Sequence, residues 1–420
     1  MKKTPWIVGL ELGPKQFVLA AGQAQDSGRL SVQAIESVPA QGFEREGLSD
    51  PIECADALAR LVRQAEQTIS GKLTRATVVF PANHLKSFNA SATVPSIDPA
   101  VGISRQDVER AVTTCRSLSL EYDRQILHSF ERGYSVDGQS GVRNPIGLAG
   151  KKLSVDLHLV TALNSTVQNF SRVLHRAGLE TDGFVLGALG TAEAVLTDLD
   201  RDLGVTLIRI GDSYTEIVLF DNSQIRDTYL IPGGWEDLLD GISRTFKIPR
   251  VSAEFLLDQV RSLEEPSPIG NDPLAQEVSG QWALKPLKTG QGAGARSFPQ
   301  EEVVAVVRAR AKELLTRIQR RLVANPLFLD SSSGIVVVGS MARLDGFLEM
   351  AESLMNMPVR LGTLKEAELN PGLSLRMQDL TPIGLLRYSM RKKAILPSVA
   401  HISPWMRPIE RVQKLLQEYF

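Results

Sequence analysis

Cysteine and histidine, which supply most metal ligands and all disulfides, are scarce in this chain. Cys54 and Cys115 are the only cysteines among 420 residues, and there are five histidines. Neither cysteine has a partner at a metal-ligand spacing, so the sequence predicts no metal site. Because no secretory leader pattern precedes them, the two thiols favour a reducing cytoplasm.

Charge of a single sign and long apolar runs are also missing. The 47 basic and 48 acidic residues leave a net charge of −1, which gives no basic field for nucleic acid to bind. No apolar run approaches the roughly 18–20 residues that span a bilayer, so we expect a chain that at most lies on a membrane. The composition is that of an ordinary globular protein, 43% hydrophobic and 23% charged, and the length predicts two or more domains.

A glycine-containing hairpin is the most informative local pattern. Residues Val205–Phe220 read as two runs of β-forming apolar residues on either side of a small-residue turn, Gly211–Ser213. Glycine in such a turn lets backbone N–H groups approach phosphate oxygens. An ordinary core hairpin is the alternative interpretation.

The same design recurs, which indicates a duplicated architecture. Trp6–Gly22 is a second strand–turn–strand unit, with its turn at Gly13–Lys15. Two such hairpins in separate halves of the chain predict two lobes with a cleft between them. Gly334–Phe347 is a third unit, a strand followed by a glycine turn and a helix, which suits the anionic or ribose groups of a nucleotide.

A segment between the first two hairpins has its own character. Strands are predicted at Phe88–Val94, Ile126–Phe130 and Leu153–Thr161, with a helix that Ser104 and Asp107 open as an acidic variant of the capping box. This pattern predicts a small α+β subdomain inserted into the larger fold. Its two histidines, His128 and His158, are assigned packing or surface roles.

The other predicted elements follow from periodicity and from turn residues. They are helices at Asp56–Ile69, Asn164–Arg176, 235–246, Ser252–Leu263, Glu301–Leu322 and Leu380–Ser389, a buried strand at Ala76–Phe80, a strand and helix over Val185–Leu196, and a loop at 264–299 with one possible strand at Gln281–Leu284.

The three turn motifs, in this order around an inserted subdomain, resemble the bacterial cell-division protein family FtsA. The likeness is densest over Asp123–Phe220 and includes the stretch Tyr134–Gly150, YSVDGQSGVRNPIGLAG, which is similar to that family's inserted subdomain. The resemblance implies an α/β, actin-like (ribonuclease H-like) two-lobed fold with an inserted small α+β subdomain of SHS2 type. It divides the chain into a first lobe (1–86 and 163–203), the insert (87–162), a second lobe (204–390, with a smaller subdomain at 235–330), a tether (391–404) and a membrane helix (405–420).

The resemblance also implies a site for ATP and Mg²⁺, but the phosphate turns are altered. The first turn keeps an acid as Glu11 and gains Pro14, which removes a backbone donor. In the second turn, Arg209 stands where the family has a carboxylate that organises hydrated Mg²⁺, and Asp212 brings negative charge to the phosphate side. Trp235 replaces a further glycine of the family.

These changes predict a degenerate pocket without ATP hydrolysis and without catalytic residues. The positions that match the family's cofactor-binding residues are Glu11, Gly13, Lys15, Arg209, Gly211, Ser213, Thr215, Gly234, Glu254 and Gly339. The alternative is that Arg209 and Lys15 pair with phosphates directly, without a metal, which would give binding without turnover.

The C-terminal residues predict an amphipathic membrane helix. Pro408 suits the first helical position, and apolar residues fall on one arc of a helical wheel with basic residues opposite. The residues assigned to the membrane are Trp405, Met406, Arg407, Ile409, Arg411, Val412, Lys414, Leu415, Leu416, Tyr419 and Phe420. Arg391 and the two lysines after it add positive charge upstream. The alternative is a terminal helix docked on the body of the protein.

The sequence therefore predicts a non-enzymatic adaptor of the division site. The resemblance implies self-association, binding of the FtsZ C-terminal peptide, contacts with other divisome proteins and attachment to anionic lipids on the cytoplasmic face of the inner membrane. Two alternatives stay open: an actin-like protein that binds or hydrolyses ATP, and a membrane scaffold derived from FtsA that serves pilus or shape machinery.

Overall fold

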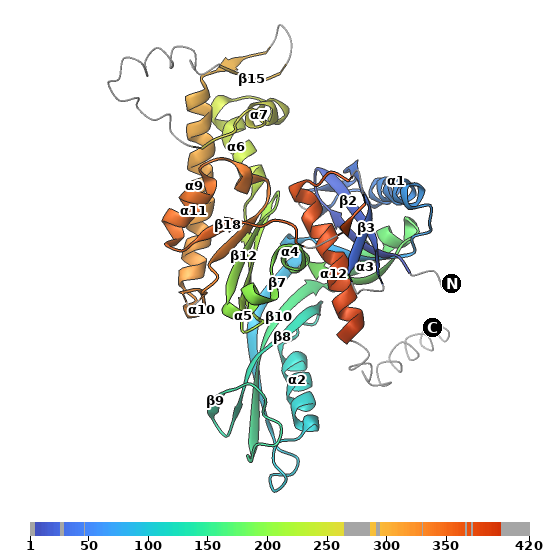
Figure 1. Ribbon diagram of the computed structural model, residues 1–420, viewed down its shortest axis with the longest axis vertical. Coiled ribbons are helices and arrows are strands. Elements are labelled where there is room, and N and C mark those ends of the chain that lie inside the picture. Colours follow the sequence, from blue (N-terminus) through green and yellow to red (C-terminus); the bar gives the residue numbers. More distant parts are fainter. Residues whose placement is uncertain are drawn as a thin grey trace.

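Two α/β lobes and a smaller sheet unit make up the molecule (Figure 1). The computed structural model describes residues 5–25, 29–45, 47–263, 286–290, 295–329, 331–365, 368–370 and 373–395. The predicted strand at Gln281–Leu284, the membrane helix and most of the tether lie outside these residues.

The first lobe is built on a six-stranded sheet in the order β11-β6-β1-β2-β3-β19. Its strands are β1 (Ile7–Leu12), β2 (Gln16–Ala24), β3 (Leu30–Pro39), β6 (Arg75–Phe80), β11 (Glu180–Leu186) and β19 (Glu368–Leu369). Its helices are α1 (Pro51–Ile69), α3 (Asn164–Arg176), α4 (Gly187–Val195), α5 (Asp198–Leu203) and α12 (Leu380–Ile395), and the short elements are β4 (Phe43–Glu44), β5 (Gly47–Leu48), η1 (Ala82–His84) and η3 (Met377–Asp379).

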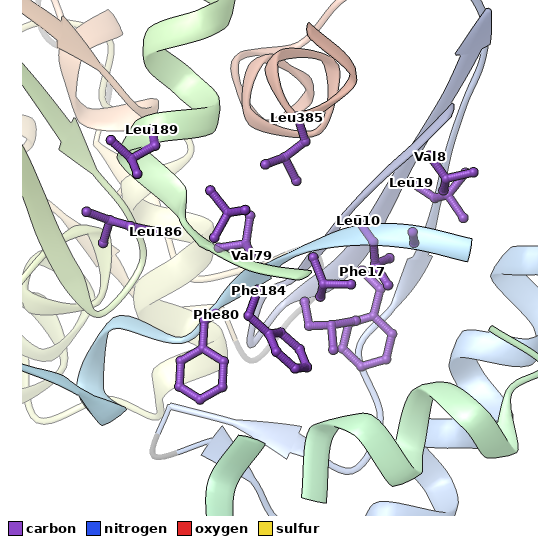
Figure 2. Packing of buried hydrophobic residues seen from close by; sticks show 14 of the residues in the cluster. Val8, Leu10, Phe17, Leu19, Val79, Phe80, Phe184, Leu186, Leu189 and Leu385 are labelled. Atoms are coloured by element: carbon purple, nitrogen blue, oxygen red, sulfur yellow. The ribbon is translucent and has the colours of Figure 1, made fainter. Parts of the chain in front are cut away.

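Alternation along the first hairpin places helices on both faces of this sheet. On one face, Leu10 and Phe17 pack toward α1 and α3, and Figure 2 shows them beside the aromatic residues of β6 and β11. On the other face, Ile7 packs with Ile383 of α12. A side chain at Gly9 would collide with the backbone of α12, so glycine permits this close approach.

The inserted unit is a four-stranded antiparallel sheet in the order β7-β10-β8-β9, with one helix packed on it. Its elements are β7 (Leu85–Pro95), α2 (Arg105–Ser119), β8 (Arg124–Val136), β9 (Gln139–Val142) and β10 (Lys152–Leu163). The capping box predicted at Ser104 and Asp107 is present, with both reciprocal hydrogen bonds.

The second lobe has a five-stranded sheet in the order β14-β13-β12-β17-β18. Its strands are β12 (Val205–Ile210), β13 (Tyr214–Asp221), β14 (Gln224–Pro232), β17 (Ile335–Val338) and β18 (Val359–Leu361). Its other elements are α6 (Trp235–Phe246), α7 (Arg250–Leu257), β15 (Leu287–Lys288), β16 (Ser297–Phe298), α9 (Gln300–Val323), α10 (Pro326–Leu329), η2 (Ser340–Arg343) and α11 (Phe347–Met355).

Both predicted hairpins form, but several predicted boundaries are wrong. Helix α7 ends at Leu257 rather than Leu263, and α1 begins at Pro51, where Asp50 caps it. Helix α12 continues to Ile395, so the tether cannot begin at Arg391. Because β19 pairs with β3 and α12 packs on β1, the last part of 204–390 belongs to the first lobe. Strands β3 and β14 and helix α5 were not predicted, since their apolar patterns are short or irregular.

The insert is joined to strand β14 of the second lobe through a buried histidine. The side chain of His158 on β10 is 2% exposed. Its Nε2 accepts from the Thr228 N–H at 3.0 Å, and its Nδ1 lies 2.6 Å from Asn89 Oδ1. Asp227 Oδ1 is 3.4 Å from Nδ1. Burial, opposed by Asp227 and aided by Arg132, lowers the pKa of His158 from 6.5 to about 4.

This histidine predicts a loss of stability in mild acid. A folded-state pKa below the unfolded value means that protons bind the unfolded chain more readily, so stability falls as the pH drops below 6.5 and levels off near 4. Between pH 7 and pH 5 the loss from this one group is about 2 kcal/mol. Between pH 7 and pH 5, the melting temperature should fall less for His158→Gln than for the native chain. The exposed His175→Gln is the control, and an equal fall in all three chains would contradict the prediction.

Candidate functional site

The turns of the two hairpins face each other across a cleft between the lobes. The inter-lobe cleft holds a cavity of about 160 Å³, lined by the first turn, the second turn, Trp235 and the turn after β17. Pockets for drug-sized ligands are typically about 300–1,000 Å³. The space in this cleft is therefore small for a nucleotide.

Arg209 lies at the centre of the cleft and connects the lobes. Strand alternation turns it to the same face of β12 as Leu207, which packs against the first lobe. Its guanidinium is ion-paired with Glu11 of β1 and, at 3.1 Å, with Glu216 of β13. Its Nε also donates to Thr381 Oγ1 of α12 at 3.1 Å. One side chain of the second lobe thus binds two elements of the first.

The carboxylates at this point outnumber the guanidinium. Burial raises the pKa of Glu11 and of Glu216, and the nearby Arg209 offsets this only in part. Burial also opposes the charge on Arg209, but the two glutamates outweigh it and raise the pKa of the guanidinium. Asp212 adds a third carboxyl group whose pKa burial raises. The cluster therefore stabilises the charged form of Arg209 and disfavours the binding of a further anion.

Lys15 is the other cation of the first turn, and it is also engaged. Its Nζ lies 2.6 Å from Glu254 Oε1, a contact that joins the lobes at the exposed rim of the cleft. When all groups are ionised, Lys15 and Arg209 face Glu11, Asp212, Glu216 and Glu254, which leaves a net charge of −2. The alternative in which both cations pair with phosphates would require these ion pairs to separate.

A third inter-lobe contact involves a residue that the sequence did not single out. Arg45, in the β4–β5 turn, lies 2.9 Å from Asp240 and 3.4 Å from Asp237, both on α6. Each contact is partly exposed, so each contributes at most about 1 kcal/mol. Glu216 was also missed as a site residue, although a lone acid inside the apolar run of β13 is a signal that could have found it.

Two backbone donors beside the cleft, at the start of α6, are used within the chain. The N–H groups of Trp235 and Glu236, the first of α6, donate to the carbonyls of Gly211 and Asp212 at 3.1 and 2.9 Å. The first N–H groups of a helix normally have no intrahelical partner and make an anion site. Here the second turn occupies them.

The glycines retained in the turns are explained by contacts between the turns themselves. A Cβ at Gly234 would lie 2.2 Å from the Gly211 carbonyl oxygen. Gly339, with φ of 135°, would place a Cβ 2.2 Å from the Ile210 carbonyl oxygen. The turn after β17 continues into the 3₁₀ helix η2, so the predicted α-helix does not directly follow Gly339.

The structure brings together most of the predicted cofactor-binding residues. Six of them line the cavity: Glu11, Gly13, Arg209, Gly211, Ser213 and Gly339. Thr215 is buried, and its hydroxyl donates to the Gly233 carbonyl at 2.9 Å, a structural role. Among the described residues, the buried Ser213 hydroxyl has no hydrogen-bond partner. The residues assigned to the membrane, from Trp405 to Phe420, lie outside the described part of the chain.

These residues do not fit a magnesium–nucleotide complex. Arg209 and its two glutamates hold the centre of the cleft, the first donors of α6 are used, and any ionised carboxylate of the cluster would repel phosphate. Within the described ranges, no group of three or more His, Cys, Asp or Glu residues could hold a metal ion.

Comparison with known proteins shows that the chain is similar to the cell division protein FtsA. Residues 82–161 match the model of the SHS2 domain inserted in FtsA. The chain is 28% identical to the cell division protein FtsA of Pseudomonas aeruginosa over 394 residues, which cover 92% of this chain and 90% of that protein. It is 29% identical to FtsA of Neisseria meningitidis over 400 residues, covering 93% and 92%.

The chain is FtsA-like and has an actin-like fold. Solved structures with low sequence identity share the fold of this FtsA-like protein. The PilM–PilN type IV pilus biogenesis complex matches with a TM-score of 0.60 at 14% identity, covering 93% of this chain and 98% of that one. ADP-bound MreB5 of Spiroplasma citri matches with a TM-score of 0.51 at 13% identity, covering 95% and 99%. The predicted actin-like fold and its SHS2 insert are confirmed.

Arg209 of the FtsA-like protein should be essential to its stability. Arg209→Ala leaves Glu11 and Glu216 buried without a cation, which costs about 3–5 kcal/mol. Chemical denaturation should show this loss. Adding Glu11→Gln to Arg209→Ala should recover part of it, because one uncompensated carboxylate is removed. Arg172→Ala on α3 is the exposed control, expected to change the unfolding free energy by about 0.5 kcal/mol or less. A loss from Arg209→Ala no larger than this control would refute the assignment.

Proposed function

We propose that this FtsA-like protein is an adaptor of cell division that tethers FtsZ filaments to the cytoplasmic face of the inner membrane. The observation that carries the proposal is the match to proteins named cell division protein FtsA over about nine-tenths of the chain, SHS2 insert included. Partners of the proposed adaptor are FtsZ through its C-terminal peptide, further copies of the chain and other divisome proteins.

Attachment to the membrane is assigned to residues 405–420. Among the described helices, none is both long and apolar enough to cross a bilayer. A helix with an aromatic and aliphatic arc opposite basic residues instead lies in the headgroup region. Such a short helix binds reversibly, and self-association multiplies its affinity through avidity.

The proposed adaptor works without ATP binding or hydrolysis. In this proposal Arg209 supplies, from within the chain, the positive charge that its two glutamates require. The inter-lobe contacts of Arg209, Lys15 and Arg45 then hold the lobes together in the absence of a nucleotide.

Recruitment of FtsZ to membranes tests the tether. FtsZ should co-sediment with anionic liposomes in the presence of the full-length chain but not of a chain truncated after Ala400. Leu416→Asp on the apolar arc should weaken sedimentation strongly, whereas Gln417→Asp, the same charge on the polar side, should have little effect. If the chain binds liposomes and leaves FtsZ in solution, the FtsZ tether is wrong and a scaffold for another client is favoured. If it ignores liposomes, the membrane assignment is wrong.

Nucleotide independence is tested by calorimetry and by the same sedimentation. Titration of Mg-ATP into the full-length chain should give no saturable heat, because the cavity is small and the ion pairs of Arg209 occupy its centre. FtsZ recruitment should be equal with and without Mg-ATP. Micromolar binding of Mg-ATP would contradict this part of the proposal and leave the tether intact.

A further inference from the structure

A second cavity lies at the C-terminal end of α12, away from the inter-lobe cleft. It has a volume of about 620 Å³ and is bounded by the start of β3, the α4–α5 segment and residues 387–391 of α12. Five basic residues line this cavity, which we call the basic pocket: Arg29, Arg201, Lys365, Arg387 and Arg391. The carboxylates of its lining are Glu193 and Asp198.

The basic pocket carries excess positive charge although its residues form ion pairs. Glu193 is shared between Arg201, at 3.0 Å, and Arg391, at 3.3 Å. Asp198 also pairs with Arg391, at 2.6 Å. Five cations and two carboxylates leave the lining with a net charge of +3. Asp200, next to the lining, is shared between Lys365 at 2.9 Å and Arg360 at 2.8 Å, and counting both Asp200 and Arg360 leaves the net charge at +3. The upstream charge that the sequence assigned to Arg391 is thus part of a built pocket.

A buried arginine in this lining has an unused donor. The side chain of Arg201 is 6% exposed. Its Nη2 donates to the Ala192 carbonyl at 2.9 Å and its Nη1 pairs with Glu193. Among the described residues, its buried Nε–H has no hydrogen-bond partner. Because this Nε–H has no exposed surface, a ligand in the cavity would interact with Arg201 through its positive charge rather than through this donor.

Apolar residues complete the pocket. Leu30 and Leu196 line it and are themselves buried, so the cavity has an apolar floor beneath the basic groups. Phosphate groups accept charge-assisted hydrogen bonds from several arginines at once, and the C–H groups of a phosphate ester can contact the apolar floor. The size and the lining suit an anion of this class.

The pocket also lies on α12, the last described helix of the chain. Arg387, Met390 and Arg391 belong to α12, which leads directly to the C-terminal residues in sequence (Figure 1). If residues 405–420 bind a membrane, as proposed above, the end of α12 and its pocket are tethered within a short chain length of that surface.

We propose that the basic pocket binds a phosphate-bearing anion of the glycerophosphate class, either a phospholipid headgroup or a free phosphate ester. The lipid source rests on the proposed membrane attachment, and the free source does not. Bound to a headgroup, the pocket would add a second point of attachment and so fix the orientation of the body on the membrane.

The test uses the full-length chain with two probes, sn-glycerol 3-phosphate in solution and vesicles of phosphatidylglycerol and phosphatidylethanolamine. The variant is Arg29→Gln with Arg391→Gln, because both side chains are at least partly exposed. The control removes the same charge at Arg172 and Arg176 on α3, outside the pocket. Arg29→Gln alone leaves the ion pairs of Arg391 intact. A loss of binding in this single variant therefore does not result from unfolding around Arg391.

For the native chain and the control, glycerol 3-phosphate should raise the melting temperature and titrate to saturation, and the double variant should lose both effects. Vesicle affinity should fall about 10- to 30-fold in the double variant relative to the control, given about 1 kcal/mol for each basic residue near an anionic surface. Loss of the soluble ligand alone identifies a free phosphate ester as the source. The proposal is overturned if neither probe distinguishes the double variant from the control. Failure of every chain to bind vesicles would instead reject the membrane attachment, while the soluble probe still decides the pocket.

Discussion

The arrangement of the two lobes depends on one guanidinium held between two buried glutamates. Arg209 comes from the second lobe, Glu11 from the first, and Glu216 stands beside Arg209 on the next strand. A buried charge is costly unless it is paired, so the closed arrangement requires each lobe to supply its member of the Glu11–Arg209 pair. The exposed pairs of Lys15 and Arg45 add little energy individually, but they fix the same closed geometry at the rim.

This constraint gives the altered turns of the cleft a common physical explanation. In an actin-like fold the glycine turns leave room and backbone donors for phosphate. Here the room at Gly234 and Gly339 is taken by neighbouring backbone, and the first donors of α6 bind the carbonyls of the second turn. A cleft closed by its own groups does not require a nucleotide to bring the lobes together. The proposed role as an adaptor fits such a body, because a tether needs a fixed shape and two binding ends rather than turnover.

The sequence predicted the elements whose signals are local. Both hairpins follow from apolar runs around a glycine turn, and the helix at Ser104 follows from its capping box. The sequence also identified Arg209 as one of the departures from the family's turns. It could not supply the partner of Arg209, because Glu11 lies 198 residues away and meets it only when the lobes are assembled. The same limit applies to Arg45 and to α12, whose packing on β1 depends on glycine contacts distant in sequence. Continuation of α12 past Ser389 was missed because its basic residues there resemble a linker, although Arg391 is held by Glu193 and Asp198.

The distance between the lobes in solution tests most directly whether Arg209 and its glutamates hold the lobes together without a nucleotide. Spin labels at Arg63→Cys on α1 and Glu313→Cys on α9, both exposed positions, report that distance by pulsed electron resonance, since the native Cys54 and Cys115 are buried. If Arg209 holds the lobes closed, we expect one narrow distribution of label-to-label distances that Mg-ATP leaves unchanged. Adding Arg209→Ala should broaden this distribution or shift it to longer distances. A broad distribution in the native protein that Mg-ATP narrows or shortens would show that closure depends on a nucleotide and would contradict the account.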